Sequence, residues 1–538
     1  MKLKYSAYLL IIPLLASCNG GGGGKGKKSS SEIPFDFDPP TIDVEQINVG
    51  SLTKDVLTGE IANDSDNYYF DFYEVSDFHG AVNYSVDDKT IGIAKMGDYF
   101  SKKRADNPGG TVVLSSGDMF QGSAESNLTR GYYVNYAMNV MGFEAMALGN
   151  HEFDWGVEWL RKNNSVQINN YSIPYLGANV FMKGTNNILD FCKSSIIIER
   201  NDFKIGVVGT LGDNAEKSIM PSLIENLEFK KELPIVQAEA TRLKAEEGCD
   251  IVVWLSHRDA KDLSSCGVSK ADGVDLVFGG HSHTNTSTET GGIPFLQTKN
   301  YGKGIAHARL AINKSTKDVT SVSYEVDDAP YTYSGLVDHP EVKKVCGAYN
   351  TVIDPIKNQV IGKTDAKLEV SGSTFSLTNL CVDTMSLVAK KWAKDHTDRK
   401  FVAAFHNANG GVRADMNAGS ITFGSVYRSF PFDNEVCIAV ATGKKLKAYF
   451  DKAASYGVWH DPSIKSYSDL VDTEEYYFST TDFMGTADNF VFRLKDEDLI
   501  RTGYIVRDSI AGRISNQKDI KAANFDRTEN AQFRVPSR

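Results

Sequence analysis

The sequence lacks an excess of positive charge, closely paired cysteines and an apolar run long enough to cross a membrane. Its formal net charge is -11, which argues against a nucleic-acid polymer as partner, because proteins that bind one usually carry a basic surface. The 7 cysteines show no Cys-x-x-Cys spacing, so a structural zinc site is not expected. The apolar run 7–15 is too short to span a bilayer. An anionic ligand would therefore have to be met by a local positive charge.

The N-terminus has the pattern of a targeting signal. Lys2 and Lys4 give a positive start, the apolar run 7–15 follows, and Leu15-Ala16-Ser17-Cys18 resembles a bacterial lipobox. We therefore expect a signal peptide at residues 1–18 and lipidation of Cys18, whose acyl chains each contribute about 0.8 kcal/mol per buried methylene to anchoring. A plain secretory signal is the alternative. Asn19 favours the outer membrane, by resemblance to enteric lipoproteins, so the expected location is the cell envelope, at the outer membrane or its periplasmic face.

Residues 19–65 are expected to form a tether and an N-terminal extension. The Gly, Lys and Ser stretch 20–31 cannot bury enough surface to order itself, so the folded body is expected to begin past Pro39. The remainder is too long for one ordinary domain, so two domains are the default. An exported chain permits disulfides. Cys249 with Cys266 is the first pair to test, and buried free thiols are an equal alternative.

The stretch Gly149-Asn150-His151-Glu152-Phe153-Asp154 carries the first chemical signal. It follows an apolar run, 145–148, that has the character of a buried strand. An Asn oxygen can ligate a metal without adding charge, and His151 can donate a proton to a leaving oxyanion if Asp154 orients it. A polar loop with an accidental histidine would be the simpler explanation if this segment stood alone.

Four other apolar runs also end in potential metal ligands. Asp77 and His79 are two residues apart, as are His281 and His283, and this spacing on a strand predicts that each pair projects to one side. Asp118 follows a glycine, which lets its carboxylate approach an ion closely, and its two oxygens could bridge two metals. The fourth run ends at His257. The other five histidines are interpreted as surface or satisfied polar residues: His307, His339, His396, His406 and His460.

The order of these segments resembles the calcineurin-type metallophosphoesterases over residues 70 to 300, and within them the 5'-nucleotidase branch. The motifs are Asp-x-His, Gly-Asp, Gly-Asn-His-Glu, a lone His after a strand, and Gly-His-x-His. The resemblance implies that one metal is held by Asp77, His79, Asp118 and His283, and a second by Asp118, Asn150, His257 and His281. It also implies that His151, steadied by Asp154, forms a catalytic dyad.

The chemistry expected of such a site is hydrolysis of a phosphoester. Two cations lower the pKa of a bound water and clamp the phosphoryl oxygens, so that a bridging hydroxide attacks in line. Imidazole-rich ligation favours zinc, manganese, iron or cobalt over magnesium or calcium. Because the ligands follow apolar strands separated by helical patterns, we expect an α/β sandwich with two packed sheets and flanking helices. With the resemblance, the expected fold is a four-layer sandwich (α/β/β/α) joined by a helix to a smaller α/β C-terminal domain that binds substrate.

The expected boundaries follow from this resemblance. Residues 66–335 would form the metallophosphoesterase domain, residues 336–359 a linker helix broken by Pro355, and residues 360–538 the C-terminal domain. Asn407-Ala408-Asn409-Gly410-Gly411-Val412-Arg413 and the block 429–434 resemble motifs of the 5'-nucleotidase C-terminal domain. By that resemblance Asn409 and Arg413 grip the substrate, and Phe432 stacks on the nucleobase.

A second stacking ring is expected from the segment 480–490, where Phe483 and Asp488 match the family's run. An ordinary core phenylalanine is an equal alternative for Phe483. The sequence departs from the family in several places: Ala408 stands where the family has Asn, Thr486 and Ala487 replace glycines, and Ser376 stands where a substrate-binding arginine is usual. The predicted metal ligands are complete, whereas the predicted specificity residues are altered.

The leading hypothesis is a cell-envelope enzyme that hydrolyses nucleoside 5'-monophosphates to nucleoside and phosphate. Its partners would be a small-molecule nucleotide or related phosphoester, and a membrane only through the lipid anchor. The altered C-terminal motifs keep open a UDP-sugar hydrolase or a 2',3'-cyclic nucleotide phosphodiesterase with the same metal chemistry. A surface lipoprotein whose C-terminal domain serves binding is the alternative from another class, and complete metal ligands argue against it.

Overall fold

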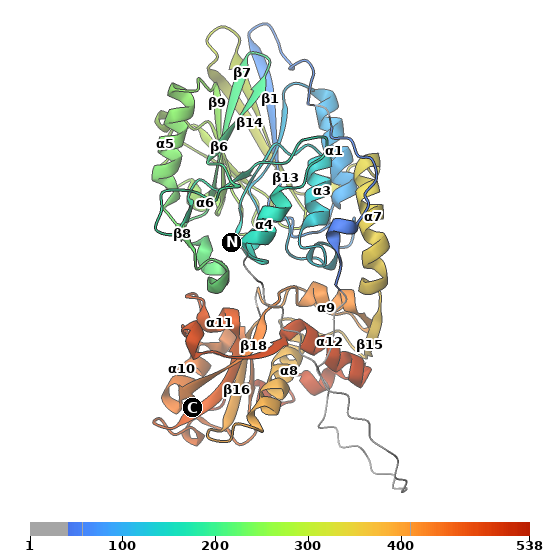
Figure 1. Ribbon diagram of the computed structural model, residues 1–538, viewed down its shortest axis with the longest axis vertical. Helices are drawn as coiled ribbons and strands as arrows, with labels where there is room; N and C mark the ends of the chain where they lie inside the picture. The colour runs from blue at the N-terminus through green and yellow to red at the C-terminus, as the bar shows by residue number, and fades with distance from the viewer. Residues whose placement is uncertain (1–40, 56, 409) are drawn as a thin grey trace, which may run out of the picture. The chain divides into compact units, whose positions relative to one another are not determined.

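The computed structural model describes residues 41–55, 57–408 and 410–538 (Figure 1). The expected signal peptide, the lipidation site Cys18 and the first part of the tether lie outside these residues, as does Asn409. Among the described helices, none combines the length and apolar character needed to cross a membrane.

Two sheets build the N-terminal part of the chain. The first has the strand order β14-β13-β1-β2-β3-β4. Its parallel strands are β1 (Asn67–Glu74), β2 (Thr111–Ser115), β3 (Ala145–Ala147) and β4 (Tyr175–Leu176), and its antiparallel edge is β13 (Ile305–Asn313) with β14 (Val319–Asp327). The second has the order β11-β12-β10-β9-β7-β6. Its strands are β6 (Ser195–Arg200), β7 (Phe203–Leu211), β9 (Ile251–His257), β10 (Leu276–Phe278), β11 (Thr286–Thr290) and β12 (Ile293–Gln297).

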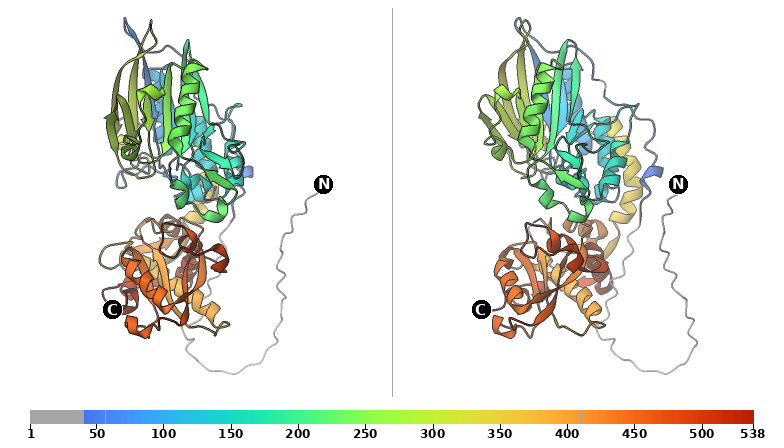
Figure 2. Two further views of the ribbon diagram at one scale, coloured as in Figure 1. Left: turned by 90° about the vertical axis from the view of Figure 1, so that its left-hand side faces the viewer. Right: turned by 60° about the vertical axis from the view of Figure 1, so that its left-hand side comes forward.

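The two sheets pack face to face because their strands alternate apolar side chains between two cores (Figure 2). On β1, Phe70 and Phe72 belong to the core between the sheets together with Val253 and Leu255 of β9. Tyr73, which points to the opposite face of β1, belongs instead to the core under the helices. Strands buried on both faces are rich in Val and Ile, as β7 is.

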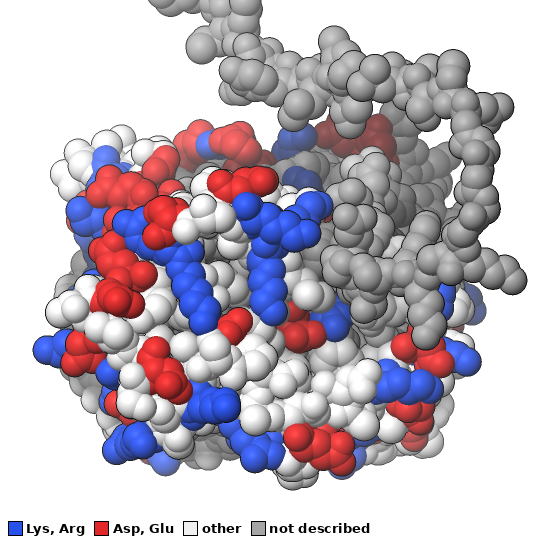
Figure 3. All heavy atoms as spheres, turned by 90° about the horizontal axis from the view of Figure 1, so that it is seen from below, with Lys and Arg blue, Asp and Glu red and all other residues white. Residues whose placement is uncertain are grey.

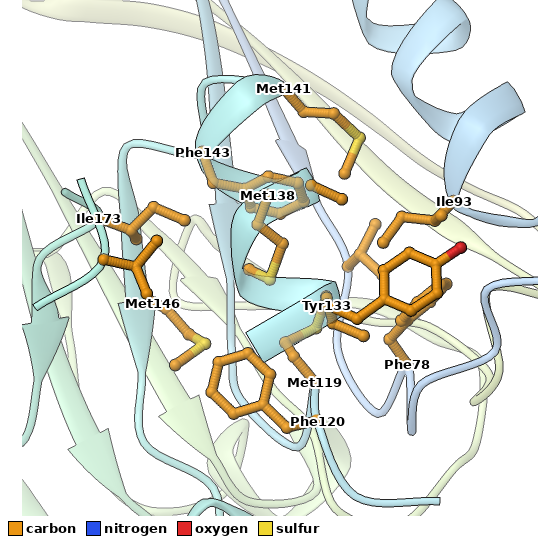
Figure 4. Close-up of a cluster of buried hydrophobic side chains, with 14 of the residues drawn as sticks. Phe78, Ile93, Met119, Phe120, Tyr133, Met138, Met141, Phe143, Met146 and Ile173 are labelled. Carbon is orange, nitrogen blue, oxygen red and sulfur yellow. The ribbon is translucent and has the colours of Figure 1, made fainter. Parts of the chain in front are cut away.

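Helices cover both outer faces, which completes four layers. On the first sheet lie α1 (Ile93–Asp106), α3 (Tyr132–Val140), α4 (Val157–Asn164) and α7 (Pro340–Lys357), and on the second α5 (Glu232–Ala245) and α6 (Ala260–Leu263). Figure 4 shows the core under the first group, where Met138 of α3 lies beside Phe143, and Met141 follows the end of the helix. The short helix α2 (Ala124–Asn127) and the two-stranded pair β5 (Val180–Met182) and β8 (Leu227–Phe229) lie outside these layers. The expected α/β/β/α sandwich is confirmed.

The expected break at Pro355 is wrong. Helix α7 runs from Pro340 to Lys357 with Pro355 inside its last turn. The proline lacks the N–H that would bond to the carbonyl four residues earlier, and its ring crowds that carbonyl, yet the helix continues for two more residues. Tyr349 of α7 stacks on Tyr133 of α3, with ring centres 5.1 Å apart, which fixes the helix to the N-terminal sandwich.

The C-terminal part is a smaller α/β unit. A five-stranded sheet has the order β19-β16-β20-β18-β21, and a three-stranded sheet the order β17-β15-β22. The strands are β15 (Val360–Thr364), β16 (Phe401–Asn407), β17 (Gly419–Thr422), β18 (Glu435–Thr442), β19 (Tyr456–His460), β20 (Glu475–Thr481), β21 (Ile500–Ile505) and β22 (Asp519–Ile520). The helices are α8 (Ser376–Ala393), α9 (Phe423–Ser429), α10 (Gly443–Lys452), α11 (Asp482–Thr486) and α12 (Val506–Gln517).

Two sequence expectations concern surface charge and cysteines. On the face drawn in Figure 3, blue and red side chains are interspersed, and the described residues of that face form no continuous basic surface.

Cys249 and Cys266 are both free thiols, so the disulfide considered for this pair is not formed. Cys249 instead packs among the apolar side chains of α5 and β7, and Cys266 lies against the same core.

Candidate metal and substrate site

The predicted ligands lie at or just beyond the carboxyl ends of β1, β2, β3, β9 and β10, where α/β sheets place their ligands. The prediction that Asp77 and His79 project to one side because they lie two residues apart on a strand is wrong, however. Strand β1 ends at Glu74, before both residues. These two residues, with Asp118, His281 and His283, instead have left-handed backbones, with φ between 49° and 75°. Such conformations cost about 1–3 kcal/mol each and concentrate at functional sites. The tight loops turn the side chains toward one another.

Two glycines allow the loops after β2 and β3 to touch. A Cβ on Gly149 would lie 2.2 Å from Oδ1 of Asp118, and one on Gly117 would lie 2.4 Å from the main-chain nitrogen of Gly149. Gly117 also has a φ of 93°. Only glycine at both positions lets the Asp118 carboxylate approach the segment that carries Asn150 and His151.

Asp77, His79 and His283 form one group of possible ligands whose ligand atoms lie within 4.8 Å of one another. Nε2 of His79 is 3.1 Å from Nε2 of His283, which in turn is 3.4 Å from Oδ1 of Asp77. Nδ1 of His79 donates to the main-chain oxygen of Gln121 at 2.8 Å. That contact leaves the Nε2 lone pair free for an ion, as a ligating histidine requires.

Asp118, His257 and His281 form the second group. Nε2 of His257 lies 3.1 Å from Oδ2 of Asp118, and its Nδ1 donates to the main-chain oxygen of Ser116 at 2.7 Å. Oδ1 of Asn150 completes this group, at 3.2 Å from Nε2 of His257 and 2.8 Å from Nδ1 of His281. All seven predicted ligands are thus brought together at one edge of the sandwich.

The donor chemistry of both groups fits divalent metal ions. Burial, reinforced by His283, holds the pKa of His79 well below its usual range, and burial lowers the pKa of His281 to about 4. Both rings are therefore neutral, which is the form that ligates metals. Burial alone would lower the pKa of His257, but the Asp118 carboxylate raises it to about 10. The buried carboxylates thus attract positive charge to this point, and mixed imidazole and carboxylate ligands suit transition metals.

His151 and Asp154 form the predicted dyad. Nδ1 of His151 donates to Oδ2 of Asp154 at 2.8 Å. Burial alone would lower the pKa of His151, but Asp154 and Asp118 outweigh it and raise that pKa above its usual value. The main-chain nitrogen of His151 also donates to Oδ1 of Asp118 at 2.8 Å, so the dyad is fixed directly to a predicted ligand.

Glu152 is a positioning residue that sequence reasoning did not single out. It is 2% exposed, and its carboxylate accepts hydrogen bonds from the main-chain nitrogens of Gly149 (2.7 Å), Asp118 (2.8 Å) and Met119 (2.9 Å). Burial raises its pKa to about 7. Its place in the Gly-Asn-His-Glu motif was the available signal, since three residues after Gly149 it can reach back to the N-terminus of the turn.

A cavity of about 270 Å³ adjoins the dyad, and we refer to it as the aromatic cavity. Of the predicted substrate-binding residues, Arg413, Phe432 and Phe483 line it. Nη2 of Arg413 is 3.2 Å from Nε2 of His151, and the ring of Phe432 stacks near the same imidazole at 5.7 Å. Asn409 lies outside the described residues. Asp488 is exposed in the turn after α11 and is not among the lining residues.

Other lining residues had not been predicted. Phe490 meets Phe483 edge to face, with ring centres 5.4 Å apart, and Asn489 lies next to it in the lining. The N-terminal sandwich contributes Trp155, Met220 and Leu223. No motif marked these three residues, because the apolar lining is assembled from separate loops.

Ser376, which stands where the family has an arginine, serves a local structural role. It is 2% exposed, and its Oγ accepts a hydrogen bond from the main-chain nitrogen of Glu369 at 2.9 Å, at the start of α8. It does not line the aromatic cavity. Among the described residues that line the aromatic cavity, position 376 therefore supplies no substrate contact of the kind an arginine would make.

Comparison with known proteins decides the family. The model of the calcineurin-like phosphoesterases matches residues 70–285, and that of the 5'-nucleotidase C-terminal domain matches residues 360–481. The chain belongs to the 5'-nucleotidase-like metallophosphoesterases. The first match covers the part of the sandwich that carries all seven predicted ligands, and the second covers the first part of the smaller unit with Arg413 and Phe432.

Relatives of this phosphoesterase are distant. It is 27% identical to endonuclease YhcR of Bacillus subtilis over 431 residues, which are 74% of this chain but 34% of that protein. It is 26% identical to the 5'-nucleotidase of Bos taurus over 390 residues, 67% of this chain and 66% of the relative. The chain thus spans about a third of the first and just under two thirds of the second. The crystal structure of a 5'-nucleotidase precursor from Thermus thermophilus shares the fold, with a TM-score of 0.67 at 19% identity over 84% of this chain and 97% of that one.

Proposed function

We propose that this phosphoesterase holds two divalent metal ions and hydrolyses nucleoside 5'-monophosphates to nucleoside and phosphate at the cell envelope. The observation that carries the proposal is the position of His151, which contacts Asp118 through its main chain and Arg413 through its ring. Asp118, Asn150 and Phe432 all line one cavity with it. A phosphoryl group beside the ligands would therefore have its leaving group in the aromatic cavity.

Each residue of the site has a separate task in this reaction. Asp154 holds Nδ1 of His151, so that Nε2 can donate a proton to the departing oxygen. Arg413 presents a guanidinium whose Nε has no hydrogen-bond partner among the described residues, and guanidinium groups bind phosphoryl oxygens strongly. When bound, the two cations would activate a water and offset the phosphoryl charge.

The aromatic cavity supports a nucleoside as the leaving group. Phe432 lies beside the dyad, and Phe483 and Phe490 form an edge-to-face pair in the same lining. Stacking on an aromatic ring contributes about 1–3 kcal/mol per base whatever its identity. The 5'-nucleotidase of Bos taurus is among the relatives, and the lipobox-like motif at Cys18 supports anchoring at the envelope.

A substrate panel tests the proposal. The full chain, stripped of metal and reloaded with manganese or zinc, would be offered AMP, UDP-glucose, 2',3'-cAMP and p-nitrophenyl phosphate. We expect AMP to give the highest kcat/KM and the metal-free protein to be inactive. Preference for UDP-glucose or the cyclic nucleotide would keep the metal chemistry and replace the substrate, and no phosphate release from any compound would refute the function.

A further inference from the structure

A second cavity, of about 540 Å³, borders the metal site, and we refer to it as the polar chamber. Gln121 and Arg413 line both the polar chamber and the aromatic cavity. His79, a predicted ligand, also lines the polar chamber, whereas Phe432 and Phe483 do not. The two spaces thus meet at Gln121 and Arg413, and they differ in chemistry.

The polar chamber is cationic, although the chain as a whole is acidic. Its charged lining consists of Lys303, Lys357, Arg413 and Arg428 against Asp88 and Glu125. Two of the cations are paired, because Nη2 of Arg428 is 3.1 Å from Oδ1 of Asp88 and Nζ of Lys357 is 2.8 Å from Oε1 of Glu125. In a chain with a net charge of -11, this local excess needs an explanation.

Arg413 and Lys303 carry the unbalanced charge. No carboxylate of the described residues forms an ion pair with Lys303, and its Nζ lies 5.4 Å from the ring centre of Tyr301. Burial lowers its pKa; the Asp88 carboxylate opposes this effect, and Arg428 reinforces it. An ammonium group that is partly desolvated and makes no direct ion pair favours binding of an anion.

Gln121 supplies the second observation. Its side chain is 2% exposed, and neither its amide nitrogen nor its amide oxygen has a hydrogen-bond partner among the described residues. Its main chain is fixed, because its carbonyl oxygen accepts from Nδ1 of His79 and because Gly122 packs so closely that a Cβ would lie 2.2 Å from the main-chain oxygen of His79. A buried amide left without a partner is costly and usually marks a ligand or a water.

We propose that the polar chamber binds a phosphate group, which Gln121 and Arg413 connect to the metal site. Phosphate oxygens accept hydrogen bonds from ammonium, guanidinium and amide N–H groups, all of which the lining presents. The group is either orthophosphate released by the reaction or a second phosphoryl group of the substrate. This choice of source rests on the proposed function, whereas the binding itself does not.

Binding is tested on the metal-free full chain by calorimetric titration with orthophosphate. We expect one phosphate per chain, and Lys303→Met should weaken its affinity about 3- to 10-fold, as expected for a partly buried charge-assisted contact. Lys299→Met, on the same loop but outside the chamber lining, is the matched control and should leave the affinity unchanged. Asp88→Asn should tighten binding, because it removes a carboxylate and frees Arg428.

Asp88→Asn is expected to change the phosphate affinity in the opposite direction from Lys303→Met. It therefore keeps the test valid if Lys303→Met fails to fold. Absence of phosphate binding to the metal-free protein at millimolar concentrations would overturn the proposal. Equal losses in Lys303→Met and Lys299→Met would do the same, since they would indicate a diffuse charge effect.

The source of the phosphate group is tested on the metal-loaded protein. If it is the product, Lys303→Met should raise the inhibition constant of orthophosphate several-fold while AMP and ADP keep their ratio of kcat/KM. If it is a second group of the substrate, the same variant should lower kcat/KM for ADP more than for AMP. No difference from the Lys299→Met control in either measurement would contradict a chamber that communicates with the site. Because the calorimetric test requires no turnover, failure of the proposed hydrolysis would remain distinguishable from failure of phosphate binding.

Discussion

Nη2 of Arg413 lies 3.2 Å from Nε2 of His151. The guanidinium from the C-terminal unit thus meets the imidazole that follows β3, and both groups line the aromatic cavity. The same His151 ring is held on its other side by Asp154. A leaving oxygen within hydrogen-bond reach of both groups would receive a proton from Nε2 and charge compensation from the guanidinium.

His151→Gln should lower kcat for AMP by about 10²- to 10⁴-fold, because general acid catalysis is lost. Metal content should stay near that of the unaltered chain, since His151 belongs to neither ligand group. Steady-state kinetics and metal analysis of the purified protein would check both. His396→Gln, an exposed histidine of the C-terminal unit, is the control and should behave as the unaltered chain. Loss of metal in His151→Gln would mean that a ligand has been mistaken for a catalyst.

Phe432→Ala should raise KM for AMP about 5- to 100-fold, in line with ~1–3 kcal/mol of base stacking. KM for p-nitrophenyl phosphate should change much less, although the small ring of that substrate retains some contact. Tyr333→Ala is the control, because Tyr333 is an exposed aromatic residue. Phe430→Ala is not suitable, because Phe430 is buried in the core. Parallel increases of KM for both substrates would remove the stacking role of Phe432.

Backbone strain at the ligands predicts that glycine, which usually lowers stability relative to alanine, should raise it at position 283. His283 has a φ of 60°, which glycine adopts freely and alanine does not. In the metal-free protein His283→Gly should therefore be about 1 kcal/mol more stable than His283→Ala, since both lose the same imidazole contacts. Urea unfolding followed by circular dichroism measures the difference. Equal stability, or greater stability of the alanine variant, would show that the loop relaxes without its side chain.

His406 predicts a pH dependence of stability that is separate from the metal site. Burial lowers its pKa to about 4, below the ordinary value of about 6.5. Between these pH values the unfolded chain binds a proton that the folded chain does not. The free energy of unfolding should therefore decrease as the pH falls from about 6.5 to about 4, by about 3 kcal/mol from this group.

The pH effect is measured by urea unfolding of the unaltered chain, His406→Gln and His396→Gln at several pH values. In His406→Gln the free energy of unfolding should fall less steeply as the pH decreases below about 6.5. His396→Gln, altered at an exposed position, should match the unaltered chain. Superimposable acid limbs for all three proteins would show that His406 is protonated in the folded state as readily as in the unfolded state.

The candidate ligands could be found in the sequence because each lies at or shortly after the end of an apolar strand, and parallel strands bring their carboxyl ends to one edge. Their division between two metals came from the family resemblance. It could not predict how Asp77 and His79 are oriented, since left-handed backbones at non-glycine residues leave no periodic signal. Glu152 was visible in its motif, but its three main-chain hydrogen bonds depend on the loop after β2, which only the folded chain brings near. Trp155, Met220 and Gln121 were missed because the lining of a cavity is set by tertiary contacts rather than by spacing along the chain.

Metal stoichiometry of the Asp118→Asn variant tests the central claim most directly. The metal-free full chain should bind two zinc or manganese ions in a calorimetric titration, corresponding to the two groups of ligands. Asp118→Asn should weaken both sites together and abolish AMP hydrolysis, because Asp118 is proposed to bridge them. Asn226→Asp, which alters an exposed loop, serves as the control. Binding of a single ion by the unaltered chain, or full retention of one site in Asp118→Asn, would contradict a shared dinuclear centre.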